Sequence, residues 1–273
     1  MKTVISASLT PPPTEVWELY HEHSKLRRRD RGCLLRITAF FASPYLLGLA
    51  SQPFRIYPTA PRVVLSSTGG EEGAVERLIA RRRSTRQWSK KAVSLSELAR
   101  MLRSMSGITG VSVSSGVSQF LRAAPSGGAL YPVETYLGLF NVAGTTEGLY
   151  HYNPREHVLE QLHSAPGLQE RLAGATVYPE VVSPCAILVM LTGVFERTIL
   201  KYGERGYRFV LLEVGHIAQN LCLLAEEMGL GAVCLGGFYD REVETVLGID
   251  GTDESILYLV AVGHKAVTED GNE

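Results

Sequence analysis

The chain has 273 residues, 45% of them hydrophobic and 20% charged, which is enough apolar chain for one large globular core. Its 27 basic and 28 acidic residues nearly cancel, so no overall charge favours binding to nucleic acid or to an anionic membrane. Four cysteines without CxxC spacing indicate reduced thiols in a cytoplasmic protein. We expect an N-terminal extension, residues 1–70, and one domain, residues 71–273.

The extension is expected to begin with a short amphipathic helix near Thr14–Tyr20, followed by His21 and His23. No other metal-ligating side chain stands at matching helical spacing, so we expect a solvated or partner-contacting histidine pair and no metal site. Cys33–Ala50 is long and apolar, but a charge and a proline interrupt it, and a membrane span needs about 20 uninterrupted residues. A buried helix or hairpin is therefore expected there.

The domain is expected to begin with a helix, residues 71–83, whose end is strongly basic. This basic end contains Arg82, Arg83, Ser84 and Arg86. Guanidinium groups beside a hydroxyl suit the charge-assisted recognition of a phosphate dianion, although a helix C-terminus stabilised by the helix dipole is the alternative interpretation. No GxxxxGK[ST] or GxGxxG sequence is present, so neither a P-loop nor a Rossmann nucleotide site is expected.

A second helix is expected from Ser94 to about Ser106, with a capping box formed by Ser94 and Glu97. Ser104–Ser118 is rich in glycine and serine and has no periodicity, which predicts a loop. Two further segments offer bare backbone to a flat ligand, although an ordinary turn is the alternative for the first of them. They are Pro125, Ser126, Gly127 and Gly128 in the first segment, and Gly236 and Gly237 in the second.

Six apolar stretches predict strands, and the helices and strands alternate without a regular βαβ repeat. This order predicts an α+β fold with a mainly antiparallel or mixed sheet flanked by helices. The continuous apolar run of the fourth stretch indicates a strand that is covered on both faces. The six stretches are Val133–Phe140, Leu149–Asn153, Val158–Leu162, Cys185–Thr192, Ala232–Leu235 and Ile256–Val262.

Leu200–Leu230 combines a charged and aromatic cluster with a long helix that is apolar nearly all round and ends at Gly229. A helix of this kind lies in a core or at a subunit interface. Lys201 and Tyr202 stand directly before it and form a candidate acid/base pair, because a partly desolvated lysine near other positive charges gives up its proton more readily. A solvated charged loop is the alternative interpretation of this pair.

Five segments, in the same order along the chain, resemble the FMN-dependent nitroreductase superfamily and in particular its SagB-type branch. This branch includes the azoline dehydrogenases of thiazole- and oxazole-modified peptide biosynthesis. The resemblance covers about residues 70–265. The five segments are Arg82–Arg86, Ala124–Glu134, Lys201–Arg208, Gly215–Asn220 and Leu235–Phe238.

The resemblance implies an α+β homodimer that holds two FMN molecules at the subunit interface. It also implies which residues bind the cofactor. Arg82, Ser84 and Lys265 would hold the phosphate, Arg86 would face the N1/O2 edge of the flavin, Pro125, Ser126 and Gly127 would line the ring, and the amide of Gly237 would approach N5. Arg83, Gly128 and Gly236 belong to the same motifs and are also expected to contact the cofactor.

The resemblance assigns to Lys201 and Tyr202 the Lys–Tyr pair of azoline dehydrogenases. It implies a two-electron oxidation of a peptide thiazoline or oxazoline to the azole, in which this pair assists removal of the Cα proton while hydride passes to the flavin. A cyclodehydratase complex is the implied partner. Two other functions stay open: an NAD(P)H-dependent oxidoreductase acting on a small molecule or a carrier-bound intermediate, and a non-catalytic scaffold subunit of a peptide-modifying complex.

Overall fold

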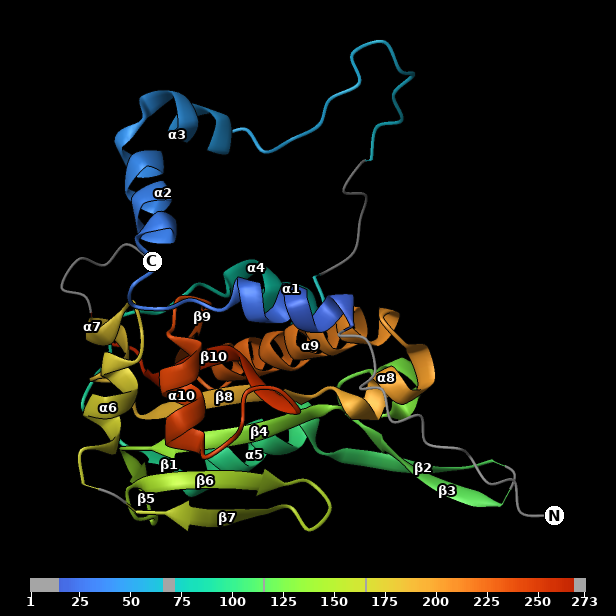
Figure 1. Ribbon diagram of the computed structural model, residues 1–273, viewed down its shortest axis with the longest axis vertical. Helices are drawn as coiled ribbons and strands as arrows, with labels where there is room; N and C mark the ends of the chain where they lie inside the picture. The colour runs from blue at the N-terminus through green and yellow to red at the C-terminus, as the bar shows by residue number, and fades with distance from the viewer. Residues whose placement is uncertain (1–14, 66–71, 115, 165, 268–273) are drawn as a thin grey trace, which may run out of the picture.

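A six-stranded sheet forms the centre of the chain in the computed structural model, which describes residues 15–65, 72–114, 116–164 and 166–267 (Figure 1). Its strands are β4 (Val133–Leu139), β6 (Gly148–Asn153), β7 (Val158–His163), β8 (Ile187–Val194), β9 (Leu230–Leu235) and β10 (Glu254–His264). They lie in the order β7-β6-β4-β8-β10-β9, and all neighbouring pairs are antiparallel. The predicted α+β fold with a mainly antiparallel sheet is therefore confirmed.

The central strand β8 is buried along almost its whole length, as its continuous apolar sequence predicts. Val189 belongs to the core on the side of α9 (Arg205–Glu227). Leu188 belongs to the opposite core, beneath α6 (Leu168–Gly174) and α10 (Asp240–Leu247). Because neighbouring side chains of a strand point to opposite faces, one strand supplies both cores.

Helix α9 is long and apolar enough to cross a membrane by length and composition alone, but half of that stretch is buried inside the fold. It packs against the sheet and against α5 (Leu95–Ser106), as expected of a core helix. At the start of α5 the Ser94 hydroxyl accepts a hydrogen bond from the Glu97 amide (3.2 Å), so the predicted capping box is confirmed. Helix α9 ends just before Gly229, whose φ of 71° is left-handed and favours glycine.

A two-stranded hairpin, β2 (Ile108–Ser114) and β3 (Val117–Arg122), stands where the glycine and serine content predicts a loop. The prediction of a loop at Ser104–Ser118 is therefore wrong for most of its length. Valines alternate with serines along β2, which is the period of a strand. The hairpin projects from the body of the chain beside α8 (Glu196–Tyr202), and serine is tolerated because this hairpin fills no core (Figure 1).

Helix α1 (Val16–Ser24) lies across the body of the chain and buries His21 there. The His21 side chain is 4% exposed, and its ring nitrogens lie 2.8 Å from Ser255 Oγ and 3.3 Å from Tyr207 Oη. The expectation of a solvated histidine is wrong at this position, because α1 covers the ring against β10 and α9. The predicted start of this helix at Thr14 lies outside the described residues.

Helices α2 (Arg31–Ala42) and α3 (Pro44–Ala50) extend away from the sheet (Figure 1). Their helical structure is confirmed, but the expected burial is wrong. Large apolar side chains such as Leu35, Phe41 and Tyr45 are exposed, because no other part of the described chain covers their outer faces. The remaining elements are α4 (Ala74–Arg81), α7 (Pro179–Val182), β1 (Val93–Ser94), β5 (Val142–Ala143) and the short 3-10 helix η1 (Gly127–Ala129).

Candidate flavin site

The basic segment after α4 runs along the edge of the central sheet. Ser84 forms a parallel bridge with Ala232 of β9, and the Thr85 amide donates to the Ala232 carbonyl (3.0 Å). Gly231 is required here, because a Cβ atom at this position would lie 2.5 Å from the Thr85 side chain. The sheet edge therefore fixes the backbone from which the neighbouring arginine side chains project.

Positive charges gather at this edge, next to the C-terminal half of α9. The Nζ atom of Lys265 lies 2.8 Å from a Glu226 oxygen, and Arg81 lies 3.7 Å from the other oxygen. Hydrogen bonds from Cys222 and Tyr258, with a smaller contribution from the charge of Arg82, lower the pKa of Cys234. Arg81 and Lys265 thus approach the same residue of α9, and Arg82 directly follows Arg81.

Arg83 and Arg86 behave differently from Arg82. The Arg83 guanidinium donates to the Ala80 carbonyl (2.8 Å) and so caps the C-terminal end of α4, which matches the helix-dipole interpretation for this one residue. Arg86 is exposed and donates weakly to the Ser84 carbonyl (3.5 Å). Both guanidinium groups retain free N–H donors for a ligand.

Gly236 and Gly237 follow β9 at the end of this strand. Gly236 is exposed, and a Cβ atom placed on it would have no neighbour within 4 Å. The Gly237 carbonyl accepts from the Val177 amide (2.8 Å), while its own N–H has no acceptor among the described residues. A free backbone N–H beside open space can donate a hydrogen bond to an atom of a flavin ring.

A second group of predicted residues lies in the loop Ser126–Tyr131, near the N-terminal end of α9. The loop contains three left-handed residues, namely Gly128 (φ 66°), Ala129 (φ 52°) and Tyr131 (φ 49°). Gln119 of β3 holds it by donating to the Gly128 carbonyl (3.2 Å) and the Ala129 carbonyl (2.9 Å). Positive φ at two non-glycine residues is costly, and such conformations gather at functional sites.

Lys201 and Tyr202 converge on this loop. A Cβ atom placed on Gly128 would lie 2.6 Å from Lys201 Nζ and 2.6 Å from Tyr202 Oη. The ring of Tyr202 also packs edge-on against Phe209 (4.9 Å between centroids), and Phe209 in turn contacts Gly127. The two glycines therefore make room for the side chains of the chain itself, and the predicted acid/base pair lies at the end of helix α8 rather than in a loop.

Glu213 is a buried residue of this region that sequence periodicity misplaces. The periodicity of α9 puts it on the polar side, yet it is 2% exposed because the loop Ser126–Tyr131 covers that side. Burial raises the pKa of Glu213 to about 7, although a hydrogen bond from Ser126 opposes the shift, and one carboxylate oxygen has no partner. The available signal was an acidic residue one turn after Phe209 within a mostly apolar helix.

The two groups do not meet in one chain. Phe209 marks the group around Gly128, and Glu226 marks the group around Lys265. These residues are about 25 Å apart along α9, at 1.5 Å per residue. The predicted site residues of one chain therefore form two separate groups, or half-sites. Their donor sets fit FMN: one has cations and a free amide, and the other has a rigid loop beside an acid/base pair.

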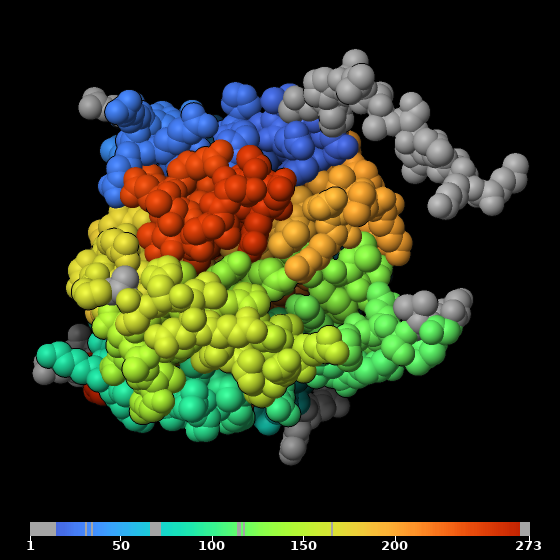
Figure 2. Space-filling view, turned by 60° about the horizontal axis from the view of Figure 1, so that its bottom comes forward, coloured from blue at the N-terminus to red at the C-terminus, as the bar shows by residue number. Residues whose placement is uncertain are grey.

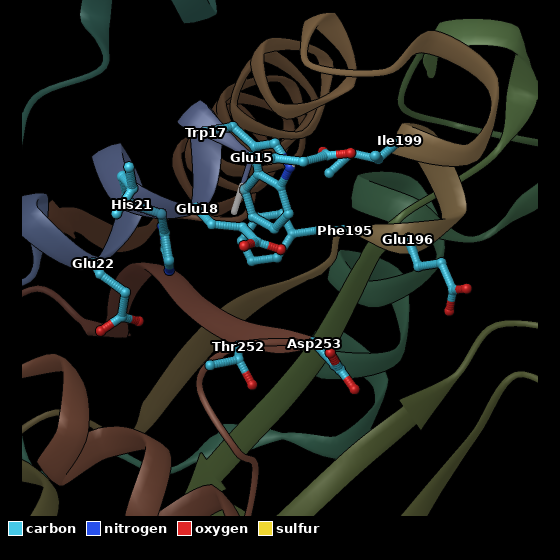
Figure 3. Close-up of a pocket in the computed structure, with 11 residues that line it drawn as sticks. Glu15, Trp17, Glu18, His21, Glu22, Phe195, Glu196, Ile199, Thr252 and Asp253 are labelled. Carbon is cyan, nitrogen blue, oxygen red and sulfur yellow. The ribbon is translucent and has the colours of Figure 1, made fainter. Parts of the chain in front are cut away.

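A separate cavity of about 530 Å³ lies between α1, the start of α8 and the turn before β10 (Figure 3). Its wall includes Trp17 and Phe195, whose ring centroids are 4.8 Å apart. Ile199 also lines it, whereas Lys201 contacts Gly128. Two residues apart on a helix point to nearly opposite sides, so Lys201 lies on the other side of α8 from this cavity. No metal-binding group of histidine, cysteine or carboxylate side chains occurs in the part of the chain that the structure describes.

An antiparallel six-stranded sheet flanked by helices, with a long core helix beside it, defines the class as an α+β fold. Residues 79–264 match the Nitroreductase family, and the chain belongs to this family. Proteins of the family bind flavin. The resemblance of the five segments to the nitroreductase superfamily is therefore confirmed for the family as a whole.

Individual relatives support the SagB-type branch. The chain is 35% identical over 195 residues to the nitroreductase-family protein MJ1384 of Methanocaldococcus jannaschii, which covers 71% of this chain and 93% of that protein. It is 33% identical over 137 residues to the microcin B17-processing protein McbC of Escherichia coli, which covers 47% of this chain and 49% of McbC. The solved E. coli microcin synthetase McbBCD complex with bound truncated pro-MccB17 shares the fold, with a TM-score of 0.66, 24% identity and 84% coverage of both chains. The predicted branch is thereby confirmed.

Proposed function

We propose that this chain is an FMN-dependent dehydrogenase that oxidises peptide thiazolines or oxazolines to thiazoles or oxazoles in the cytoplasm. The observation that carries the proposal is the convergence of Lys201 Nζ and Tyr202 Oη on the backbone of Gly128. The similarity to McbC, a protein named for processing a peptide, supports a peptide substrate.

The chemistry requires a base and a hydride acceptor. Bound FMN supplies the hydride acceptor, with molecular oxygen as the final acceptor of the two electrons. Lys201 in its amine form takes the Cα proton of the azoline, and Tyr202 orients the amine from the same side of the loop. Loss of one proton and one hydride leaves the aromatic azole. The chain itself thus contributes positioning and proton removal.

The site is proposed to form between two copies of the chain. Arg82, Ser84 and Lys265 of one copy would hold the phosphate, while the amide of Gly237 would meet the ring. The loop Ser126–Tyr131 of the other copy would bring the acid/base pair to the same flavin. The separation of the two half-sites along α9 supports this arrangement, and exposed leucines at the N-terminal half of α9 offer an apolar contact surface. A cyclodehydratase is the proposed further partner.

A direct test uses the purified protein loaded with FMN and a synthetic peptide that contains one thiazoline. Under air, the wild type is expected to convert the ring to a thiazole, seen by mass spectrometry as the loss of two hydrogen atoms. Lys201→Ala and Tyr202→Phe should retain flavin absorbance but form product about 100-fold more slowly, because general-base assistance is worth about this much. Undiminished azole formation in both variants would contradict the assigned role.

A second function has specific support from the 35% identity to MJ1384, a nitroreductase-family protein that is matched over nearly its whole length. In that case the chain would oxidise NAD(P)H and reduce a small molecule or a carrier-bound intermediate. Rapid NAD(P)H consumption with no azoline conversion would favour this function. A purified protein that binds no flavin would favour a scaffold role instead.

A further inference from the structure

A cavity of about 460 Å³ opens beside the loop Ser126–Tyr131, between the β2–β3 hairpin, the β6–β7 turn and the start of α8. Figure 2 looks onto this face, where the hairpin (green), strands β6 and β7 (yellow-green) and α8 (orange) adjoin. Three arginines line the cavity, each from a different element, and a single carboxylate lines it with them. They are Arg122 at the end of β3, Arg155 in the β6–β7 turn, Arg197 in α8, and Glu134 in β4.

The one carboxylate is already neutralised. Glu134 pairs with Arg197 (2.5 Å) and lies 3.1 Å from His151. Burial alone would raise the pKa of Glu134, but hydrogen bonds from His151 and Arg197 and their charges lower it. Arg197 also donates to the Tyr131 carbonyl (3.1 Å), so its Nη1 group makes two contacts within the chain.

Arg122 and Arg155 lack such partners. Neither guanidinium makes an ion pair or donates a hydrogen bond to any residue that the structure describes. The Arg122 guanidinium lies over the Tyr131 ring (4.9 Å), and burial lowers the pKa of Arg122 despite the opposing charges of Glu134 and Glu213. Arg122 is partly buried and Arg155 is exposed. Guanidinium groups with unused donors can bind a planar anion, because each presents two parallel N–H donors to a carboxylate.

The cavity lies next to the proposed reaction site, because the loop Ser126–Tyr131 borders both. Arg197 and Lys201 are four residues apart and lie on the same side of α8. The loop that forms one wall of the cavity also places Gly128 against Lys201 and Tyr202. A chain-like ligand bound in the cavity would therefore extend along α8 toward the acid/base pair.

We propose that Arg122 and Arg155 form a carboxylate-binding subsite that recognises an acidic group flanking the reactive ring of a peptide substrate. The carboxylate comes from an aspartate or glutamate side chain or from the peptide C-terminus. The subsite rests on the proposed function only for its role in substrate selection, because binding itself requires no redox chemistry.

The test is a binding measurement by fluorescence anisotropy on the FMN-loaded protein. Three labelled peptides carry one thiazole, the stable product ring, in a glycine-rich sequence. The first has aspartates on both sides of the ring and an amidated C-terminus. The second has asparagines and an amidated C-terminus, and the third has asparagines and a free C-terminal carboxylate. The protein variants are the double substitution Arg122→Gln with Arg155→Gln and, as a matched control, Arg171→Gln on the exposed side of α6.

The wild type and the Arg171→Gln control should bind the aspartate peptide or the free-carboxylate peptide at least tenfold more tightly than the neutral peptide, roughly the effect of one charge-assisted contact. The double variant should lose this preference and keep its affinity for the neutral peptide. Which acidic peptide is preferred identifies the source of the carboxylate. Equal binding of all three peptides to the wild type, or a preference that survives in the double variant, would overturn the subsite.

The outcome for the subsite is separable from that for the dehydrogenase. Preference for the acidic peptide without any oxidation of the thiazoline form refutes the proposed reaction and leaves the subsite in place. Oxidation of the thiazoline without any preference for an acidic flank refutes the subsite and leaves the proposed reaction in place.

Discussion

Gly128 shows at the residue scale why glycine is needed beside the proposed acid/base pair. Its φ of 66° is left-handed, and the space that a Cβ atom would take is filled by Lys201 Nζ and Tyr202 Oη. The small size of the residue thus allows both side chains to reach the backbone. Sequence reasoning assigned this glycine to a flat ligand, whereas the structure shows that the side chains of the chain itself use the space.

Gly128→Ala is expected to lower kcat/KM about 100-fold, because displacement of a positioned base by about 1 Å has this order of effect. Flavin content, measured by absorbance, should not change. Gly144→Ala is the matched control, since Gly144 also has a positive φ (85°) but a Cβ atom there meets nothing within 4 Å. Both variants should lose a similar amount of stability, about 1–2 kcal/mol, and only the first should lose turnover. Equal turnover in the two variants would refute the contact argument.

At the residue level, a sequence points to candidate residues where a motif carries the signal and misses those that only packing brings into a site. Lys201 and Gly128 were singled out from their motifs, yet nothing in the sequence indicates that they touch across about 70 residues of chain. Glu213 and Arg122 were missed, because their significance comes from the loop and hairpin that fold over them. A helical period cannot show that a loop covers the polar side of a helix.

At the scale of elements, the predicted strands and the long helix were recovered because each has a strong period. The β2–β3 hairpin was missed because its serines and glycines resemble a loop, and a two-stranded ribbon with no buried face needs no apolar side. Helices α2 and α3 were predicted to be buried, since an apolar sequence does not reveal whether the same chain supplies a covering surface.

Helix α1 gives a prediction of pH dependence. Burial, followed by the charge of Lys25, lowers the pKa of His21 from 6.5 to about 4. Between these values the unfolded chain binds a proton that the folded chain does not, so the free energy of unfolding falls as the pH decreases. The expected loss is about 2 kcal/mol between about pH 7 and about pH 5.

Chemical denaturation at the two pH values, followed by tryptophan fluorescence, measures this loss, since Trp17 of α1 stacks on Tyr207. Glu213 and Asp240 have raised pKa values and act in the opposite sense, so the comparison needs a variant without the histidine. His21→Asn should be less stable than the wild type near pH 7 but should show a smaller decrease toward pH 5. The same decrease in both proteins would rule out His21 as its cause.

At the scale of the whole molecule, the two half-sites predict complementation between copies. Arg82→Ala should lose FMN and Lys201→Ala should lose base catalysis, so each homodimer is inactive. A hybrid dimer of the two variants contains one doubly defective site and one intact site, because each flavin uses Arg82 of one copy and Lys201 of the other. When the two variants are mixed and refolded together, half of the dimers should be hybrids, and each hybrid has one intact site out of two. The mixture should therefore regain about a quarter of wild-type activity. No recovery would indicate a site contained within one chain.

The sequence motifs predicted the family and its sheet from local patterns, but the arrangement of two half-sites about 25 Å apart appears only when α9 is seen as a rigid spacer. This spacing is a property of the assembled chain, and no motif encodes it.

The central claim is that a thiazoline peptide gives up its hydride at this site with help from Lys201. The most direct measurement is anaerobic mixing of the FMN-loaded protein with a thiazoline peptide, without NAD(P)H, while flavin absorbance is followed. The wild type should lose the oxidised flavin band in a single turnover, and Lys201→Ala should lose it about 100-fold more slowly. A wild-type flavin that stays oxidised in the presence of the peptide, yet is reduced by NAD(P)H, would contradict the account.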